Sequence, residues 1–290
     1  MTENSFYDEN QRAQINKLVD DMTLFDDDLM SHVFDKNIEA TELILRIILG
    51  ENIRVISVDG QDDMKNPLVE GRNITLDVHA IDSRGREIDI EVQGNARGAA
   101  VERARFHSSM VDVRMLKANQ DFRELKDSYV IFIYKKDKFH ENQPIYHIDR
   151  IVRETGKPFE DGSHIIYVNG SYKGDGEIAQ LMEDFHQKDS ENMHYKALAD
   201  SVRHFKENEK GRGTMCEAVE KFAKEIAEEY AKEYAKEYAK EYADDCNVTN
   251  VQNLMTNLKF TLEQALDALN IQGDSRTYII TQLQKQQANS

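Results

Sequence analysis

The chain has 290 residues, 54 acidic against 37 basic side chains, and a formal net charge of −17. No apolar run approaches the roughly 20 residues that cross a bilayer, and the polar N-terminus is unlike a signal peptide. Cys216 and Cys246 have neither a pair spacing nor a histidine partner, which is typical of free thiols in a reducing compartment. These features argue against a membrane-spanning or disulfide-stabilised protein. They predict a soluble cytoplasmic protein with one ordinary domain plus appendages.

The first clear element is a helix over residues 37–49, and Gly50 fits its C-terminal stop. Its apolar residues are too dense for a surface helix. Those expected to face a core are Ile38, Leu45, Ile48 and Leu49. Glu39 and Glu42 lie in its first turns, where an acid ordinarily matches the helix dipole. Either glutamate could instead complete a metal site, and Glu39 is preferred because it lies nearest the helix start.

A β-hairpin is predicted next, with strands at residues 74–81 and 86–93. A three-residue loop that ends in a left-handed glycine is a favoured connection, and Gly85 provides it. The resulting register places His79 opposite Asp89 and Asp77 opposite Glu91.

Side chains alternate along each strand, so Asp77, Glu91 and Gln93 share one face of the hairpin. Like charges that lie opposite each other destabilise a hairpin, so a face that keeps them is expected to bind a divalent cation. The alternative is a half-exposed hairpin whose acids simply face water. His79 and Asp89 fall on the same face and are expected to be neighbours of the site rather than ligands.

The charge balance changes directly after the hairpin. Residues 1–93 hold 9 Lys/Arg against 21 Asp/Glu, whereas residues 94–140 hold 10 against 6. The cations expected to contact phosphate, on or beside a helix predicted over about residues 98–116, are Arg97, Arg103, Arg105 and Lys117. A solvated helix face is the alternative for each arginine. Because the whole chain is strongly acidic, any binding to nucleic acid is expected to be weak and sensitive to salt.

The remaining part of the domain alternates strands and helices. Strands are predicted at residues 128–134 and 164–169, and helices at residues 177–185 and 194–206. No glycine group matches a P-loop or a dinucleotide fingerprint, so no nucleotide cofactor site is expected. The pattern indicates an α/β domain.

This order of elements resembles the PD-(D/E)XK nuclease superfamily, and more closely its transposase family, also called recombination-promoting nucleases. The resemblance covers about residues 20–220 and is carried by residues 37–49, 76–78, 88–93, 103–109, 129–133, 144–150 and 161–170. It implies an α/β fold with a restriction-endonuclease-like core, a mixed sheet flanked by helices, within a nuclease-like domain at residues 1–210.

The resemblance also implies a catalytic set, namely Glu39, Asp77, Glu91 and Gln93. Asp77 and Glu91 would hold Mg²⁺ (or Mn²⁺), together with the Val92 carbonyl, and Glu39 would reach the metal directly or through water. A water activated there would attack the phosphorus in line.

Gln93 stands where the superfamily usually has a lysine, and its amide carries no charge. Gln93 could orient the attacking water while Arg103 or Arg105 replaces the missing cation. Because the Glu-x-Gln form is familiar in the transposase family, the glutamine alone does not imply a dead enzyme, although it puts turnover in question.

Two further units are expected towards the C-terminus. Residues 214–244 contain a four-residue repeat with tyrosines at 230, 234, 238 and 242. A stripe with this spacing drifts by about 40° per repeat, so it favours a solvated helical spacer over a straight coiled-coil seam. A homodimer through this helix is the alternative. Residues 247–290 are expected to form a small helical unit with helices at 251–258, 261–269 and 274–283, either a capping bundle or a docking module.

The leading functional hypothesis is a metal-dependent DNA endonuclease of the transposase-associated type, which acts in recombination or mobile-element biology and has no membrane partner. One alternative is a catalytically inactive nuclease fold that still binds nucleic acid. The other is an oligomerising interaction protein that works through its C-terminal helices. Metal binding at Asp77 and Glu91 separates the first hypothesis from the last, and turnover separates the first two.

Overall fold

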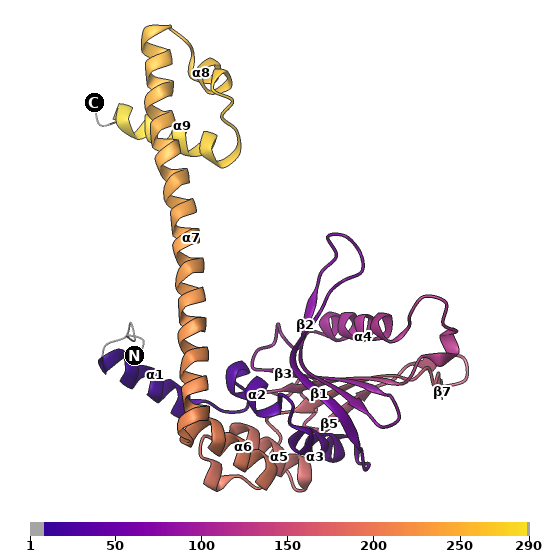
Figure 1. The fold of residues 1–290 in the computed structure, drawn as a ribbon. Helices are drawn as coiled ribbons and strands as arrows, with labels where there is room; N and C mark the ends of the chain where they lie inside the picture. The colour runs from indigo at the N-terminus through magenta and orange to yellow at the C-terminus, as the bar shows by residue number, and fades with distance from the viewer. Residues whose placement is uncertain (1–8, 289–290) are drawn as a thin grey trace. The chain divides into compact units, whose positions relative to one another are not determined.

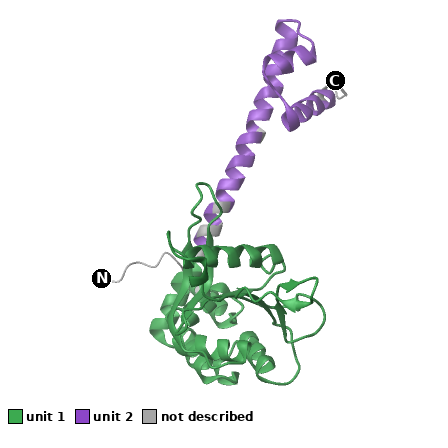
Figure 2. Ribbon diagram, turned by 90° about the vertical axis from the view of Figure 1, so that its right-hand side faces the viewer, with its two compact units in different colours: residues 1–220 green, residues 221–290 purple. Residues whose placement is uncertain are grey.

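The computed structural model describes residues 9–288, and the chain divides into two compact units at residues 1–220 and 221–290 (Figure 2). The elements of the first unit are α1 (Glu9–Asp21), α2 (Asp27–Phe34), α3 (Ile38–Leu49), β1 (Val55–Met64), β2 (Ile74–Asp82), β3 (Glu87–Gln93), α4 (Val101–Met115), a 3₁₀ turn (Phe122–Glu124), β4 (Ser128–Tyr134), β5 (Ile145–Ile148), β6 (Ile151–Val152), β7 (Lys157–Pro158), β8 (Ser163–Asn169), α5 (Glu177–His186), a second 3₁₀ turn (Ser190–Asn192) and α6 (Lys196–Glu207).

Six strands of the first unit form one mixed sheet in the order β1-β2-β3-β4-β8-β5. β1, β2 and β3 pair antiparallel, β3, β4 and β8 pair parallel, and β5 returns antiparallel to β8. Because β3, β4 and β8 run in the same direction, their carboxyl ends meet at one edge of the sheet. The predicted α/β class with a mixed sheet flanked by helices is confirmed.

The two faces of this sheet are covered differently. On one face α2, α3, α5 and α6 pack over the main apolar core, which contains Ile44 of α3, Phe185 of α5 and Ile90 of β3 (Figure 1). α4 covers the opposite face, where Phe132 and Tyr167 stack with ring centroids 5.3 Å apart. The polar residues of β3 lie on this second face, between the strand and α4.

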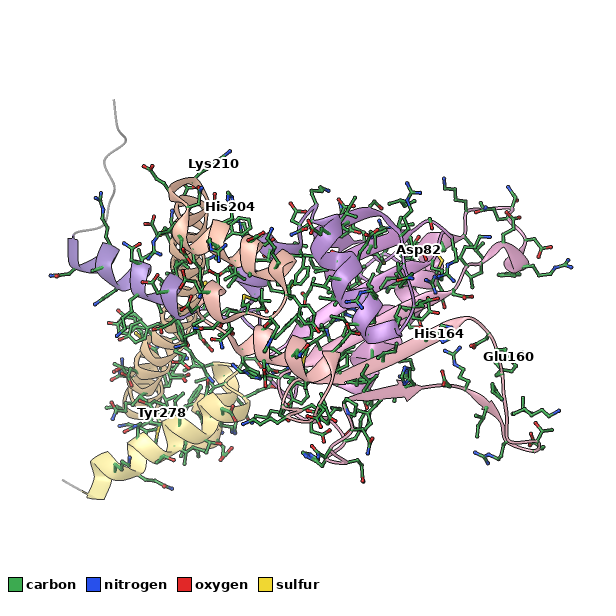
Figure 3. The ribbon with its side chains drawn as sticks, turned by 90° about the horizontal axis from the view of Figure 1, so that it is seen from below. Asp82, Glu160, His164, His204, Lys210 and Tyr278 are labelled. Carbon is green, nitrogen blue, oxygen red and sulfur yellow. The ribbon has the colours of Figure 1, made fainter. Side chains whose placement is uncertain are left out.

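Local sequence signals account for the connections around the hairpin. Gly85 adopts a left-handed conformation in the β2–β3 turn (φ +77°), beside Asp82, which is labelled in Figure 3. Gly50 ends α3 with φ +66° and closes it through a hydrogen bond to the Arg46 carbonyl. One expectation for α3 is wrong. Ile38 is 41 % exposed because it lies at the first helical position, before the helix turns its apolar face to the sheet.

The second unit is helical, and its first helix begins within the first unit. α7 runs without interruption over Glu209–Asn257, followed by α8 (Leu262–Ala268) and α9 (Gly273–Ala288). The separate helix expected over 251–258 is therefore wrong, because these residues continue α7. Thr261 caps α8 through a reciprocal pair with Gln264, and Val251, Leu266 and Ile279 form a small core. The repeat tyrosines are exposed by 62 to 71 %. None of the described helices is both long and apolar enough to cross a membrane.

Candidate active site

Two carboxylates become fixed where β2 and β3 stop pairing. Counted from the turn, the regular pairing of β2 with β3 ends at Val78 opposite Ile90, and Asp77 is the next residue of β2 in that direction. Beyond that point side chains replace the ladder. Glu91 Oε1 accepts a hydrogen bond from Asp77 N at 3.1 Å, and Asp77 Oδ2 accepts one from Val92 N at 3.0 Å. The main chain of each strand therefore holds the carboxylate of the other, and these two hydrogen bonds fix the positions of both acids.

Gln93 links the same two acids. Its Nε2 lies 3.3 Å from Asp77 Oδ2 and 3.4 Å from Glu91 Oε2, in donating position to both. The loop after β3 leaves room for this amide because Gly98 has no side chain. A Cβ at Gly98 would lie 1.8 Å from Gln93 Oε1. The structure thus brings together Asp77, Glu91 and Gln93, three of the four residues in the predicted catalytic set.

α4 adds a cation and an imidazole to this face. Arg103 Nη2 donates to Glu91 Oε2 at 2.5 Å, and Arg103 Nε donates to His107 Nε2 at 3.3 Å. Because His107 Nε2 accepts, its Nδ1 carries the proton and donates to Asp89 Oδ2 at 2.8 Å. Asp89, Arg103 and His107 therefore form one hydrogen-bonded chain that ends on Glu91. Asp89 is more than the neighbour expected from sequence, since it orients a residue of the site.

The site holds more negative than positive charge, and the pKa values of its acids are raised. Burial, followed by the Glu91 carboxylate, raises the pKa of Asp77 to about 8. Burial, followed by the Asp89 carboxylate, raises the pKa of Glu91 to about 8 as well. Burial and then the charge of Asp77 hold the pKa of Asp89 well above its usual value. Burial lowers the pKa of His107, which favours the neutral imidazole. One arginine does not balance two buried carboxylates and a half-buried one.

This arrangement fits a divalent cation. Asp89, Glu91 and His107 are buried and have potential ligand atoms within 4.8 Å of one another, and the two carboxylates are the available ligands because both ring nitrogens of His107 are engaged in hydrogen bonds. Within the described part of the chain, Asp89 Oδ1 is buried and has no hydrogen-bond partner. Carboxylate oxygens are the ligands that Mg²⁺ and Mn²⁺ prefer, and a cation would remove the repulsion that raises these pKa values. Of the predicted metal ligands, only Glu91 belongs to this particular cluster, and Asp77 joins it through Gln93.

A cavity of about 850 Å³ opens in front of these groups. Asp77, Gln93, Arg103 and His107 line it. Of the other cations proposed for phosphate contact, Arg97 also lines the cavity, whereas Arg105 points to solvent elsewhere on α4 and Lys117 lies beyond the end of that helix. Arg72, at the end of the long β1–β2 loop, lines the cavity too and was not anticipated.

The helix acid requires a correction. Glu39 is exposed on α3 and does not line the cavity, and Glu42 instead accepts a hydrogen bond from Val55 N at 2.8 Å. Two acids from helix starts line the cavity instead, Asp27 in the first turn of α2 and Glu102 in the first turn of α4, and of these Asp27 belongs to a helix that precedes the hairpin. Burial raises the pKa of Asp27, and Arg103 opposes this rise. A signal was present in the run Asp26-Asp27-Asp28 ahead of the apolar Leu29, Met30 and Val33, but no motif marks it.

Comparison with protein families gives one match. The sequence model of the family described as PD-(D/E)XK nuclease family transposase matches residues 35–249. No curated protein and no solved structure gives a match.

Proposed function

The chain belongs to the PD-(D/E)XK nuclease family transposases, and on that premise we propose that it is a metal-dependent DNA endonuclease. The observation that carries the proposal is the carboxylate cluster of half-buried Asp77 with buried Asp89 and Glu91, held by main-chain and side-chain donors but balanced by a single arginine. An uncompensated cluster of this kind costs stability. Binding a divalent cation gives it a function.

In the proposed site Asp77 and Glu91 hold Mg²⁺ or Mn²⁺ together with the Val92 carbonyl. When bound, the cation supplies positive charge for the scissile phosphate and makes water a stronger acid. Asp27 takes the place that Glu39 was expected to fill, because it lines the same cavity. Asp27 lies before residue 35, where the family match begins, so its assignment depends on geometry alone.

The other residues of the cavity position the substrate. Gln93 keeps both carboxylates oriented and offers its amide oxygen to the attacking water. Arg103, fixed through His107, provides the permanent positive charge that Gln93 lacks. Arg72 and Arg97 stand at the cavity wall, where they would contact phosphates on either side of the cleaved bond.

The test is nicking of supercoiled plasmid by the full chain at low salt with Mg²⁺ or Mn²⁺. Asp77→Asn and Glu91→Gln keep the shape of each side chain while removing its charge. Glu87→Gln serves as the control, because Glu87 is the first residue of β3, at the other end of the strand. Wild-type nicking that chelator and both site variants abolish, but the control keeps, would support the proposal. Nicking that persists in the site variants would overturn it.

The second candidate is an inactive nuclease fold that binds nucleic acid, and Gln93 in place of lysine is the observation that favours it. Anisotropy of a labelled duplex, recorded alongside the plasmid assay, separates the two. Binding without nicking under any divalent cation would favour the inactive form.

The proposal also includes a cellular role and a location. The family description supports a role in recombination or mobile-element activity. The two free cysteines support a reducing cytoplasmic location.

We further propose that residues 214–244 act as a spacer between the nuclease-like domain at 1–210 and the helical unit at 247–290. A homodimer through the exposed tyrosines of α7 is the alternative, and the molar mass in solution decides between them.

A further inference from the structure

A second, smaller groove lies at the carboxyl ends of the parallel strands. It measures about 440 Å³, within the usual range for a small-ligand site. Lys135, which follows β4, lies on one side, and Ser171, Tyr172 and Lys173, which follow β8, lie on the other. His186 of α5 completes the wall and donates to the Gly170 carbonyl at 2.9 Å.

This groove adjoins the candidate active site through two independent connections. The first is the sheet itself, because Lys135 N donates to the carbonyl of Gln93 at 2.9 Å. The second is the segment before α2, where the ring of Phe25 lies 5.6 Å from Lys135 Nζ and 4.7 Å from the ring of His186. Two residues further along the chain, Asp27 lines the active-site cavity. Gln93, which lines the first cavity, and Lys135, which lines the second, are therefore hydrogen-bonded neighbours at the carboxyl ends of β3 and β4.

The groove is basic in an otherwise acidic protein. Lys135, Lys136 and Lys173 are exposed, and none of them forms an ion pair with a described residue. Of the acids near these lysines, Asp137 and Glu183 are hydrogen-bonded, and only Glu183 is among the acids that line the groove. Asp137 accepts hydrogen bonds from Tyr146 Oη and from the main chain, and Glu183 accepts one from His194 Nε2 at 2.6 Å. Two lysines against the single carboxylate of Glu183 give the groove lining an excess of positive charge, which suits an anionic ligand.

Tyr172 gives the groove an aromatic wall, and a glycine makes room for it. A Cβ at Gly174 would lie 2.1 Å from the Tyr172 hydroxyl, so any side chain there would displace the ring. The ring is half-buried and lines the same groove as the two lysines. An aromatic face flanked by cations is the combination that binds single-stranded nucleic acid, because the base stacks while the phosphate is neutralised.

We propose that this groove is a nucleotide subsite for the substrate strand, flanking the nucleotide cleaved in the active site. Tyr172 stacks on the base, and Lys135 and Lys173 contact the adjacent phosphates. The subsite extends the proposed nuclease function, and it assigns to the enzyme a substrate strand that is unpaired on one side of the cleaved bond.

The test measures binding of a short fluorescein-labelled single-stranded DNA to the full chain, in an Asp77→Asn background that prevents cleavage. The double variant Lys135→Glu/Lys173→Glu is compared with Lys126→Glu/Lys157→Glu, which makes the same change in net charge at exposed lysines away from this edge. Tyr172→Ala is compared with Tyr172→Phe, which keeps the aromatic face. Circular dichroism confirms that each variant is folded.

We expect the groove pair to weaken binding roughly tenfold more than the control pair, and to reduce the slope of log K against log salt by about 1.4, because two single-strand phosphate contacts are lost. Tyr172→Ala should weaken binding roughly tenfold, and Tyr172→Phe should bind as wild type.

Equal effects of the two lysine pairs, or wild-type binding by Tyr172→Ala, would overturn the subsite. If plasmid nicking by the wild type depends on Asp77 and Glu91 while the lysine pairs bind alike, the subsite fails and the nuclease stands. If the groove variants lose binding but no nicking occurs, the nuclease fails and the subsite stands. Absence of any binding by the background protein overturns the subsite whatever the result of the plasmid assay.

Discussion

The hairpin of β2 and β3 carries a carboxylate cluster at each end, and the two clusters are built in opposite ways. At the turn, Asp82 accepts hydrogen bonds from Arg86 Nε at 2.8 Å and from two main-chain N–H groups at 2.9 Å, and Glu51 pairs with Arg86 Nη1 at 2.5 Å. Burial alone would raise the pKa of Asp82, but the hydrogen bonds from Arg86 hold it below its usual value.

At the open end of the same hairpin, burial and mutual repulsion raise the pKa of Asp77 and of Glu91 to about 8. The acids at the turn therefore stabilise the fold, whereas the acids at the open end weaken it and are available to a cation.

The largest expected effect is on cleavage at the open end. Asp77→Asn and Glu91→Gln should each reduce nicking by more than roughly 100-fold, because even partners behind a metal ligand usually cost 10- to 100-fold. The same variants should raise the melting temperature of the metal-free protein, since each removes a repelled charge. A parallel loss of folding and cleavage would contradict the division between the two ends.

At the turn, a substitution should lower the stability of the fold and leave nicking unchanged. Arg86→Met leaves Asp82 buried without its partner, which should cost about 3–5 kcal/mol in the free energy of unfolding. Nicking per folded molecule should stay unchanged. Arg84→Met is the matched control, because this neighbouring arginine is 53 % exposed and should contribute no more than about 1 kcal/mol. Urea denaturation of the three proteins measures the difference.

The single cation of the open end gives the next effect. Arg103→Gln should reduce nicking by about 10- to 100-fold, because Glu91 and His107 lose the donor that orients them. Arg105→Gln removes the same charge from an exposed position on the same helix and should leave nicking within twofold or so of wild type. Equal losses would show that only the overall charge of α4 matters.

The smallest effect is a pH-dependent shift in stability. The folded pKa values of Asp77 and Glu91 lie above their unfolded values of about 4, so their contribution to stability is fully present below about pH 4 and is lost as the pH rises through 8. A cation requires the deprotonated acids, so Mg²⁺ or Mn²⁺ should raise the melting temperature by a few degrees at about pH 9 and by less at about pH 6. Asp77→Asn should diminish this difference. A larger rise at the lower pH would place the cation elsewhere.

Much of the site was predictable because its geometry is local. Alternation along a strand places Asp77, Glu91 and Gln93 on one face whatever the rest of the chain does, and Gly85 fixes the register between the two strands. The ends of β4 and the stop of α3 at Gly50 were likewise read from short patterns. β1 was not predicted, because its sequence contains a glycine and three aspartates and lacks a regular alternation.

The helix acid could not be chosen in this way. Glu39 and Asp27 both lie in the first turn of a helix, and nothing in the sequence tells which helix start approaches the strands. α3 packs its apolar side on the sheet with Glu39 turned to solvent, while the start of α2 reaches the cavity. The hydrogen bond from His107 to Asp89 joins residues 18 positions apart, on α4 and β3, so it too depends on how α4 lies across the sheet.

The family, the carboxylate face of the hairpin and the glutamine beside it are all readable from the amino-acid sequence, because they depend on residue order and on the two-residue period of a strand. Three features follow from the packing of the whole chain: Asp27 rather than Glu39 lines the cavity, Arg103 pairs with Glu91, and a second groove lies at the ends of β4 and β8. These features depend on how helices and strand ends from distant parts of the chain pack together, and that packing follows from burying a shared core rather than from any local pattern.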